Sequence, residues 1–205
     1  MNEWRRFTNG WPGDEMARRF AGTADREQFY ASGKQAAQDI DAALGVKGRD
    51  LASFTSILDF GCGCGRILMW FGPLSKTVPV HGVEIDEEAA RWAQHHIPYA
   101  TISSIKPEPP IDYADDFFDL VYCQDFFYRA DDETAKSWLA ELQRVTRPGG
   151  ILVLAARGDF LNSLLSQRWS GLSLAAHLQR ALLGKFDLVV LDRIANERRD
   201  DSIAS

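Results

Sequence analysis

Three glycines at alternate positions constrain this chain more than any other part of its sequence. Residues 57–66 read ILDFGCGCGR, a short apolar run with an acid, followed by Gly61, Gly63 and Gly65. This pattern predicts a buried strand that turns tightly into a helix, because glycine adopts backbone conformations that other residues avoid. Peptide N–H groups at the start of a helix bind anions. We therefore expect the backbone to approach an anionic or nucleoside ligand closely.

The rest of the chain alternates between the two kinds of regular element. We expect strands near residues 55–60, 78–83, 99–102, 118–123, 151–156 and 186–191. We expect helices near residues 14–20, 25–44, 66–74, 86–96 and 131–147, and a mostly helical stretch at 159–183. This alternation predicts an α/β fold, a doubly wound Rossmann-like sheet of six to seven mostly parallel strands with helices on both faces. Ligands of such sheets bind at the carboxyl ends of the strands.

Length and charge narrow the class of protein. The 205 residues are enough for one domain, which we place at 25–205, after an irregular arm at 1–24. Within this domain we expect a helical lid at 25–45, a core sheet at 55–156 and a C-terminal region of helix and strand at 157–205. The net charge of −6 and the isoelectric point of about 5.2 disfavour a nucleic-acid partner. No stretch approaches 18 apolar residues, and the first ten residues lack a signal-peptide core. We expect a cytoplasmic protein without membrane contact.

The three cysteines predict neither disulfides nor a metal site. Cys62, Cys64 and Cys123 are an odd number, which indicates reduced thiols in a cytoplasmic chain. No second Cys/His pair at zinc spacing accompanies Cys62 and Cys64. We therefore expect no bound metal.

An acid at the end of the second expected strand supports a nucleoside ligand. Glu84, in VHGVEID, follows Gly61 by 23 residues, close to the spacing at which an acid accepts hydrogen bonds from ribose hydroxyls. Asp86 is a competing candidate. Because Asp86 precedes Glu87 and Glu88, we interpret it as the N-cap of the next helix.

Three motifs together resemble those of class I S-adenosylmethionine-dependent methyltransferases. The turn reads D-x-G-x-G-x-G from Asp59 to Gly65, and Arg66 stands where the dinucleotide fingerprint would place a glycine. Residues 118–121 read FDLV, and residues 144–150 read RVTRPGG, as at the fourth strand and the following helix end of that family. The resemblance covers about residues 25–156. It implies S-adenosylmethionine as the cofactor.

The resemblance also implies cofactor contacts. The glycine-loop residues and Asp59 would hold the methionine part, Glu84 the ribose, and Ile85 the adenine. The full set of implied cofactor-binding residues is Tyr30, Gly33, Asp59, Phe60, Gly61, Cys62, Gly63, Arg66, Glu84, Ile85, Ser103, Cys123 and Gln124.

Some of these contacts have alternatives. The FGCGCGR loop is similar to that of a small-molecule subgroup in which a helix before the first strand covers the cofactor, so Tyr30 and Gly33 would touch its methionine end. Tyr30 could instead pack in the core. Many relatives carry an acid after the third strand that binds the adenine amino group, whereas this chain has Ser103. The family fold also adds an antiparallel seventh strand, which is not obvious in this sequence.

The acceptor is the least determined part of the prediction. The segment from Cys123 to Tyr128 lacks the Asn/Asp-Pro-Pro-Tyr/Phe motif of enzymes that methylate amino groups of nucleic acids or amides of proteins, which favours a small molecule. Asp125, Tyr128 and His177 are candidate general bases. A binding protein without catalysis and an NAD-dependent oxidoreductase remain as alternative functions. The oligomeric state cannot be read from the sequence.

Overall fold

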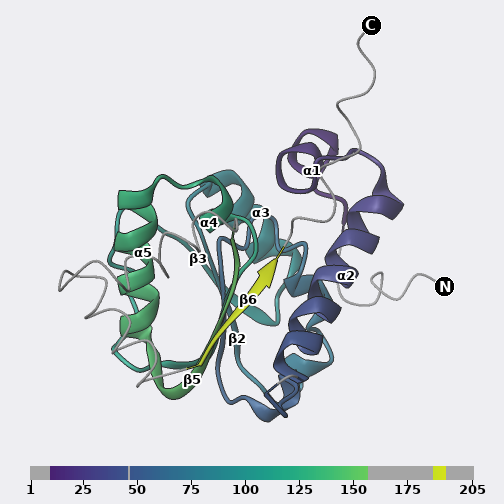
Figure 1. The fold of residues 1–205 in the computed structure, drawn as a ribbon. Helices are drawn as coiled ribbons and strands as arrows, with labels where there is room; N and C mark the ends of the chain where they lie inside the picture. Colours follow the sequence, from purple (N-terminus) through teal and green to yellow (C-terminus); the bar gives the residue numbers. More distant parts are fainter. Residues whose placement is uncertain (1–9, 46, 157–186, 193–205) are drawn as a thin grey trace, which may run out of the picture.

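The computed structural model describes residues 10–45, 47–156 and 187–192. Its centre is one sheet of parallel strands with helices on both sides (Figure 1). The strands are β1 (Ile57–Phe60), β2 (Val80–Glu84), β3 (Ala100–Ser104), β4 (Phe118–Cys123), β5 (Thr146–Ala156) and β6 (Asp187–Asp192). The helices are α1 (Asp14–Ala21), α2 (Arg26–Gly45), α3 (Glu87–His96), α4 (Phe126–Arg129) and α5 (Asp132–Val145), with 3₁₀ turns η2 (Leu51–Ser53), η3 (Leu68–Trp70) and η4 (Leu74–Lys76). The predicted doubly wound α/β class is confirmed.

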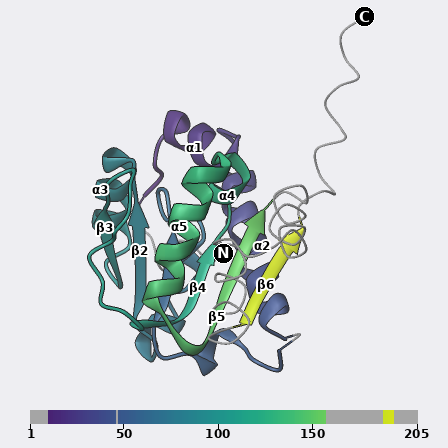
Figure 2. The same cartoon turned by 60° about the vertical axis from the view of Figure 1, so that its left-hand side comes forward.

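The strand order brings the ends of the central strands together. The order is β3-β2-β1-β4-β5-β6. Figure 2 shows β3 and β2 toward one edge of the sheet and β5 and β6 toward the other. Asp59 of β1 is paired with Gly82 of β2 and with Tyr122 of β4. Because these strands are parallel, their carboxyl ends lie at one edge, where the chain changes its direction of winding between β1 and β4. A ligand site is expected at that edge.

Apolar side chains fill both faces of the sheet. On one face α2 and α3 contribute buried residues such as Phe29, Ile40 and Ala93. On the other face α5 contributes Trp138 and Leu139. Figure 1 shows α2 and α5 on opposite sides of the strands. The strands β1 and β4 between them are buried at every residue.

The helix expected at 66–74 is wrong. The glycine loop, residues 61–65, leads into turns and then into η3 and η4. Met69 N donates to Gly65 O at 3.0 Å, which closes one α-type turn. Gly72 and Pro73 end the segment there, because proline has no N–H for the helical ladder and one or two turns alone are unstable. The glycine loop is therefore not followed directly by an α-helix.

The helix α5 has its expected cap but ends earlier than expected. The Asp131 side chain accepts a hydrogen bond from Thr134 N at 2.9 Å and so caps the N-terminus. The last helical residue is Val145, and β5 begins at Thr146, so residues 148–150 lie within this strand rather than before it. The pairing of β4 with β5 shifts in register here, and Gly149, with a φ of 77°, accommodates the bulge.

The last described strand extends the sheet beyond the core expected at 55–156. β6 pairs with β5 in parallel, from Ile151 with Asp187 to Ala156 with Asp192. Within the described part of the chain, the neighbour of β5 is therefore this parallel strand and not an antiparallel seventh strand. The helical stretch expected at 159–183 lies outside the described residues.

Candidate cofactor site

The glycine loop turns through three left-handed glycines. Gly61, Gly63 and Gly65 have φ angles of 75°, 56° and 75°. A Cβ on Gly63 would lie 2.5 Å from the Phe20 ring, and a Cβ on Gly65 would lie 2.0 Å from Ile97. Both conformation and space therefore require glycine at these two positions.

Amides of the loop are bonded within the protein. Gly61 N and Cys62 N donate to Val83 O at 2.9 and 3.0 Å. Gly63 N donates to Oε2 of Glu84 at 2.7 Å. These three amides are not free to bind an anion. They fasten the loop to the carboxyl end of β2 instead.

The Glu84 carboxylate is held in place by backbone donors. Besides the Gly63 amide on Oε2, its Oε1 accepts hydrogen bonds from Ile85 N at 2.8 Å and from Asp86 N at 2.9 Å. The side chain is buried. A carboxylate has about four acceptor positions, so Glu84 can still accept a hydrogen bond from a ligand hydroxyl.

Asp59 is a buried acid with an unused oxygen. Its Oδ2 and the phenol oxygen of its strand neighbour Tyr122 have no well-formed hydrogen bond among the described residues, although the two groups lie close enough to interact. Burial raises the pKa of Asp59 to about 8, although Tyr122 lowers it in part. A buried acceptor without a donor is costly, so this position favours a ligand with a donor such as an ammonium group.

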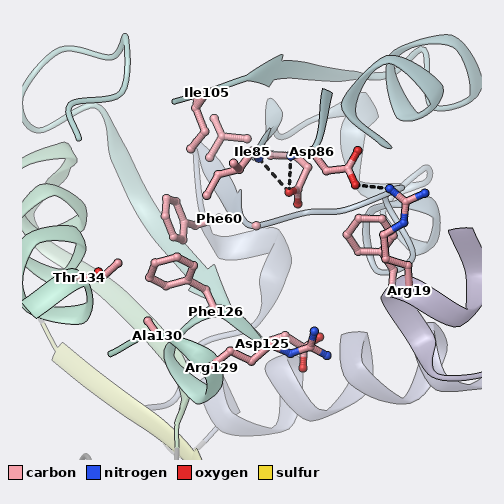
Figure 3. Close-up of a pocket in the computed structure, with 14 residues that line it drawn as sticks. Arg19, Phe60, Ile85, Asp86, Ile105, Asp125, Phe126, Arg129, Ala130 and Thr134 are labelled. Atoms are coloured by element: carbon pink, nitrogen blue, oxygen red, sulfur yellow. Dashed lines mark hydrogen bonds and ion pairs between the residues drawn. The ribbon is translucent and has the colours of Figure 1, made fainter. Parts of the chain in front are cut away.

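A cavity of about 390 Å³ opens at this edge of the sheet. Figure 3 shows its lining, with Ile85 and Asp86 on one side and Phe126, Ala130 and Arg129 on the other. The lining residues come from the β1 and β2 ends, α1, α4 and the segments beside them: Arg19, Phe20, Phe60, Gly61, Val83, Glu84, Ile85, Asp86, Ile105, Asp125, Phe126, Arg129, Ala130 and Thr134.

Part of the predicted cofactor set lines this cavity and part lies behind it. Phe60, Gly61, Glu84 and Ile85 line it, together with the candidate base Asp125. The predicted cofactor residues outside the lining are Tyr30, Gly33, Asp59, Cys62, Gly63, Arg66, Ser103, Cys123 and Gln124.

Two of these outer residues pack the helix α2 against its surroundings. The Tyr30 ring lies 5.3 Å from Phe29 and 6.1 Å from Trp11, and its hydroxyl donates to Gly10 O at 3.3 Å. A Cβ on Gly33 would lie 2.2 Å from Arg66 O. Gly33 thus lets α2 contact the residue that follows the glycine loop. Cofactor contact by Tyr30 and Gly33 stays a prediction.

Arg66, which follows the glycine loop, contacts both α2 and Asp125 in the cavity wall. Its guanidinium is nearly buried; one nitrogen donates to Oγ of Ser32 at 3.2 Å, and another lies 3.8 Å from Oδ2 of Asp125. Asp125 in turn is 41% exposed and lines the cavity, so this carboxylate is accessible to a ligand. Tyr128 belongs to α4, and His177 lies outside the described residues.

The thiols near the site are unreactive. Burial raises the pKa of Cys64 to about 12, and it raises the pKa values of Cys62 and Cys123 as well. They stay protonated at neutral pH.

In the described part of the chain, His, Cys, Asp and Glu side chains form no group of three that could hold a metal ion. The helices described here are also too short or too polar to span a bilayer.

Sequence reasoning missed the contribution of α1. Arg19 forms ion pairs with Asp86 and with Glu88, the latter at 2.8 Å. Its neighbour Phe20 packs on Gly63, so α1 covers one rim of the cavity. A helix near 14–20 was expected, but a single sequence gives no signal that it packs against residues more than 40 positions away.

A doubly wound parallel sheet, a left-handed glycine turn and an acid held at the neighbouring strand end define a Rossmann-like domain for a nucleoside cofactor. Residues 58–154 match the family described as "Methyltransferase domain". In this match and in its strand order, the described core is similar to class I S-adenosylmethionine-dependent methyltransferase domains. Membership in the subgroup with the FGCGCGR loop stays a prediction.

Curated relatives share part of this chain. Over 165 residues it is 27% identical to the malonyl-[acyl-carrier protein] O-methyltransferase of Salmonella typhimurium, covering 79% of the chain and 61% of the relative. Over 171 residues it is 26% identical to the protein of the same name from Hahella chejuensis, covering 78% of the chain and 61% of the relative. The chain thus spans about three fifths of the length of these relatives.

Solved structures show the same fold. A Galdieria sulphuraria protein, provisionally described as a sarcosine dimethylglycine methyltransferase, has a TM-score of 0.52 to this chain at 17% identity. The similarity covers 71% of this chain and 60% of the other. Because the identity is only 17%, this comparison supports the fold alone.

Proposed function

We propose that the protein transfers a methyl group from S-adenosylmethionine to a small organic acceptor. One observation carries this proposal. The Glu84 carboxylate is hydrogen-bonded to the glycine loop and lines the same cavity as Ile85 and Phe126. One site thus combines a fixed acid, an apolar wall and an open side, which suit a ribose, an adenine and an acceptor respectively.

The residues present fit this cofactor. Glu84 would accept hydrogen bonds from the ribose hydroxyls, and Ile85 and Ile105 offer apolar surface to the adenine. Asp59 is buried behind the cavity lining, and the resemblance assigns its carboxylate to the amino group of the methionine part. When bound, the cofactor supplies a sulfonium-linked methyl group that is already electrophilic. The protein therefore has mainly to orient the reactants and exclude water.

The acceptor is proposed from the site and from the relatives. The described lining carries apolar and aromatic groups opposite Glu84, including Phe126 and Ala130. The named relatives are O-methyltransferases whose acceptor is an acyl group on a carrier protein. We extend to this chain only the coarser idea of a small organic acceptor. Asp125 is the candidate base if the acceptor must lose a proton.

Calorimetry tests the cofactor assignment. The wild type should bind S-adenosylhomocysteine, and Glu84→Gln should weaken this binding by about tenfold or more, because hydrogen bonds to a charged group are lost. Glu87→Gln is the matched control. Glu87 is an exposed acid on α3 whose carboxylate forms a surface ion pair with Arg91 at 3.9 Å, and it does not line the cavity. A cooperative thermal melt of each variant, with a lower midpoint expected for Glu84→Gln, would show that the fold is retained.

The alternatives give different results in the same experiment. Binding of NAD without binding of S-adenosylhomocysteine would contradict the proposal and favour an oxidoreductase. Binding of the cofactor without transfer of labelled methyl groups to any component of a metabolite extract would favour a protein that binds without catalysis.

A further inference from the structure

Arg129 is a cation in the cavity wall whose charge is not used elsewhere in the described structure. It is the last residue of α4, is exposed and lines the cavity beside Phe126 and Ala130 (Figure 3). Within residues 10–45, 47–156 and 187–192, its guanidinium makes no hydrogen bond or ion pair. A guanidinium without such a partner can form two parallel hydrogen bonds with the carboxylate or phosphate group of a ligand.

The other charges of the cavity wall already have partners. Arg19 is engaged by Asp86 and Glu88. Glu84 is bonded to backbone amides. Asp125 lies 3.8 Å from the buried Arg66, which offsets its charge. Of the lining residues, Arg129 is thus the cation available to a ligand.

The surroundings of Arg129 are apolar and well packed. The Phe126 ring lies 5.2 Å from Phe60 and 6.1 Å from Trp138, in edge contacts. Phe127 is buried in the core, which fixes the position of α4. A ligand on this side therefore meets an aromatic wall next to one cation, an arrangement that suits a molecule with an apolar body and an anionic group.

We propose that Arg129 binds an anionic group of the methyl acceptor and so selects amphipathic acids over neutral molecules of the same shape. This inference rests on the proposed function, because it assumes that the Glu84 side of the cavity holds the cofactor. It adds the charge of the acceptor, which neither the fold nor the family determines.

Binding of a matched pair of probes tests the inference. Octanoate and 1-octanol share an eight-carbon chain and differ in charge, and each is titrated into protein saturated with S-adenosylhomocysteine. The wild type should prefer octanoate by about tenfold, as expected for a charge-assisted hydrogen bond. Arg129→Gln should reduce the preference to less than about twofold, and Arg129→Lys should keep part of it, since a single charge remains.

Arg91→Gln is the matched control, because Arg91 is an exposed arginine on α3 that does not line the cavity. It should keep the wild-type preference. Equal binding of the two probes by the wild type, or no binding of octanoate, would overturn the inference. So would a tenfold loss of S-adenosylhomocysteine affinity in Arg129→Gln, because Arg129 would then bind the cofactor carboxylate. If the wild type does not bind S-adenosylhomocysteine at all, the proposed function itself has failed.

Discussion

Gly63 and Glu84 are 21 positions apart in the sequence and are joined by a hydrogen bond of 2.7 Å from the Gly63 amide to the Glu84 carboxylate. The bond connects the turn after β1 with the end of β2. Since the same carboxylate also accepts hydrogen bonds from the amides of Ile85 and Asp86, three amides from two backbone segments share one side chain. These bonds fix the position of the Glu84 carboxylate at the cavity wall.

Replacing Gly63 should cost more stability than replacing another left-handed glycine. Gly63→Ala forces an alanine to a φ of 56° and pushes its methyl group into the Phe20 ring. We expect a loss of about 3 kcal/mol in the free energy of unfolding. Gly48→Ala is the control, with a φ of 67° and no atom within 4 Å of its Cβ, and should cost only about 1–2 kcal/mol. Urea unfolding measures both, and equal losses would refute the steric contact.

The raised pKa of Asp59 predicts how stability depends on pH. Its native pKa is about 8 and its ordinary value is 3.8, so between these pH values the folded protein holds a proton that the unfolded chain has released. Stability should therefore fall as the pH rises from about 4 to 8 and change little above that range, with a slope of at most about 1.4 kcal/mol per pH unit. Asp59→Asn should remove this component from unfolding curves measured across that range. A variant that keeps the full slope would show that another group causes it.

Cofactor binding should change the protonation of the same residue. If a cationic amino group lies against Asp59, the carboxyl group must ionise, so the complex should release a proton near pH 7. Calorimetry with S-adenosylhomocysteine in buffers of different ionisation enthalpy measures this release. Asp59→Asn should release none. The same proton release in this variant would exclude Asp59 as its source.

The Asp119 carboxylate should be essential to the start of β1. It accepts hydrogen bonds from Ser56 N at 2.7 Å and Thr55 N at 2.8 Å and pairs with Arg147. Asp119→Asn places an amide among these donors, and we expect a loss of about 2–4 kcal/mol in chemical unfolding. Asp39→Asn, at an exposed acid that accepts one hydrogen bond from Gln35, should change stability by less than about 0.5 kcal/mol. Similar values for the two variants would contradict this role.

The contact of α1 with α3 should slow the release of the cofactor. Arg19→Gln removes the ion pairs with Asp86 and Glu88 that hold α1 over the cavity rim. We expect S-adenosylhomocysteine to dissociate faster, in a stopped-flow measurement, than from the wild type. Arg18→Gln changes a neighbouring arginine that is 3.9 Å from Asp14 on the same helix, and it should dissociate at the wild-type rate. No difference between the variants would argue that α1 does not retain the ligand.

The sequence predicted those parts of the site that depend on local patterns. Alternating glycines after a short apolar run favour a turn with left-handed backbone, and the structure has it at Gly61, Gly63 and Gly65. The acid expected at the second strand end is the last residue of β2, because an apolar run followed by an N-cap is a local signal. The contact of Glu84 with ribose is still a prediction.

Contacts between distant segments could not be predicted in the same way. The packing of Phe20 on Gly63 depends on where α1 docks, and the lining by Ile105 rather than Ser103 depends on which side chains of this region face the cavity. The helix expected at 66–74 failed for a different reason. Its apolar spacing was suitable, but Gly72 and Pro73 leave too few residues after Gly65 for a stable ladder.

The 3₁₀ turns after the glycine loop change the origin of the electric field at the site. A helix dipole is permanent, because peptide groups do not titrate between pH 4 and 10. Here the ligand also meets charged side chains such as Glu84 and Arg129, beside the N-terminus of α3. Protonation neutralises the charge of a carboxylate, and a single substitution can replace a negative side chain with a positive one. Ligand preference in this protein should therefore be adjustable by acidity and by single substitutions without rebuilding the backbone.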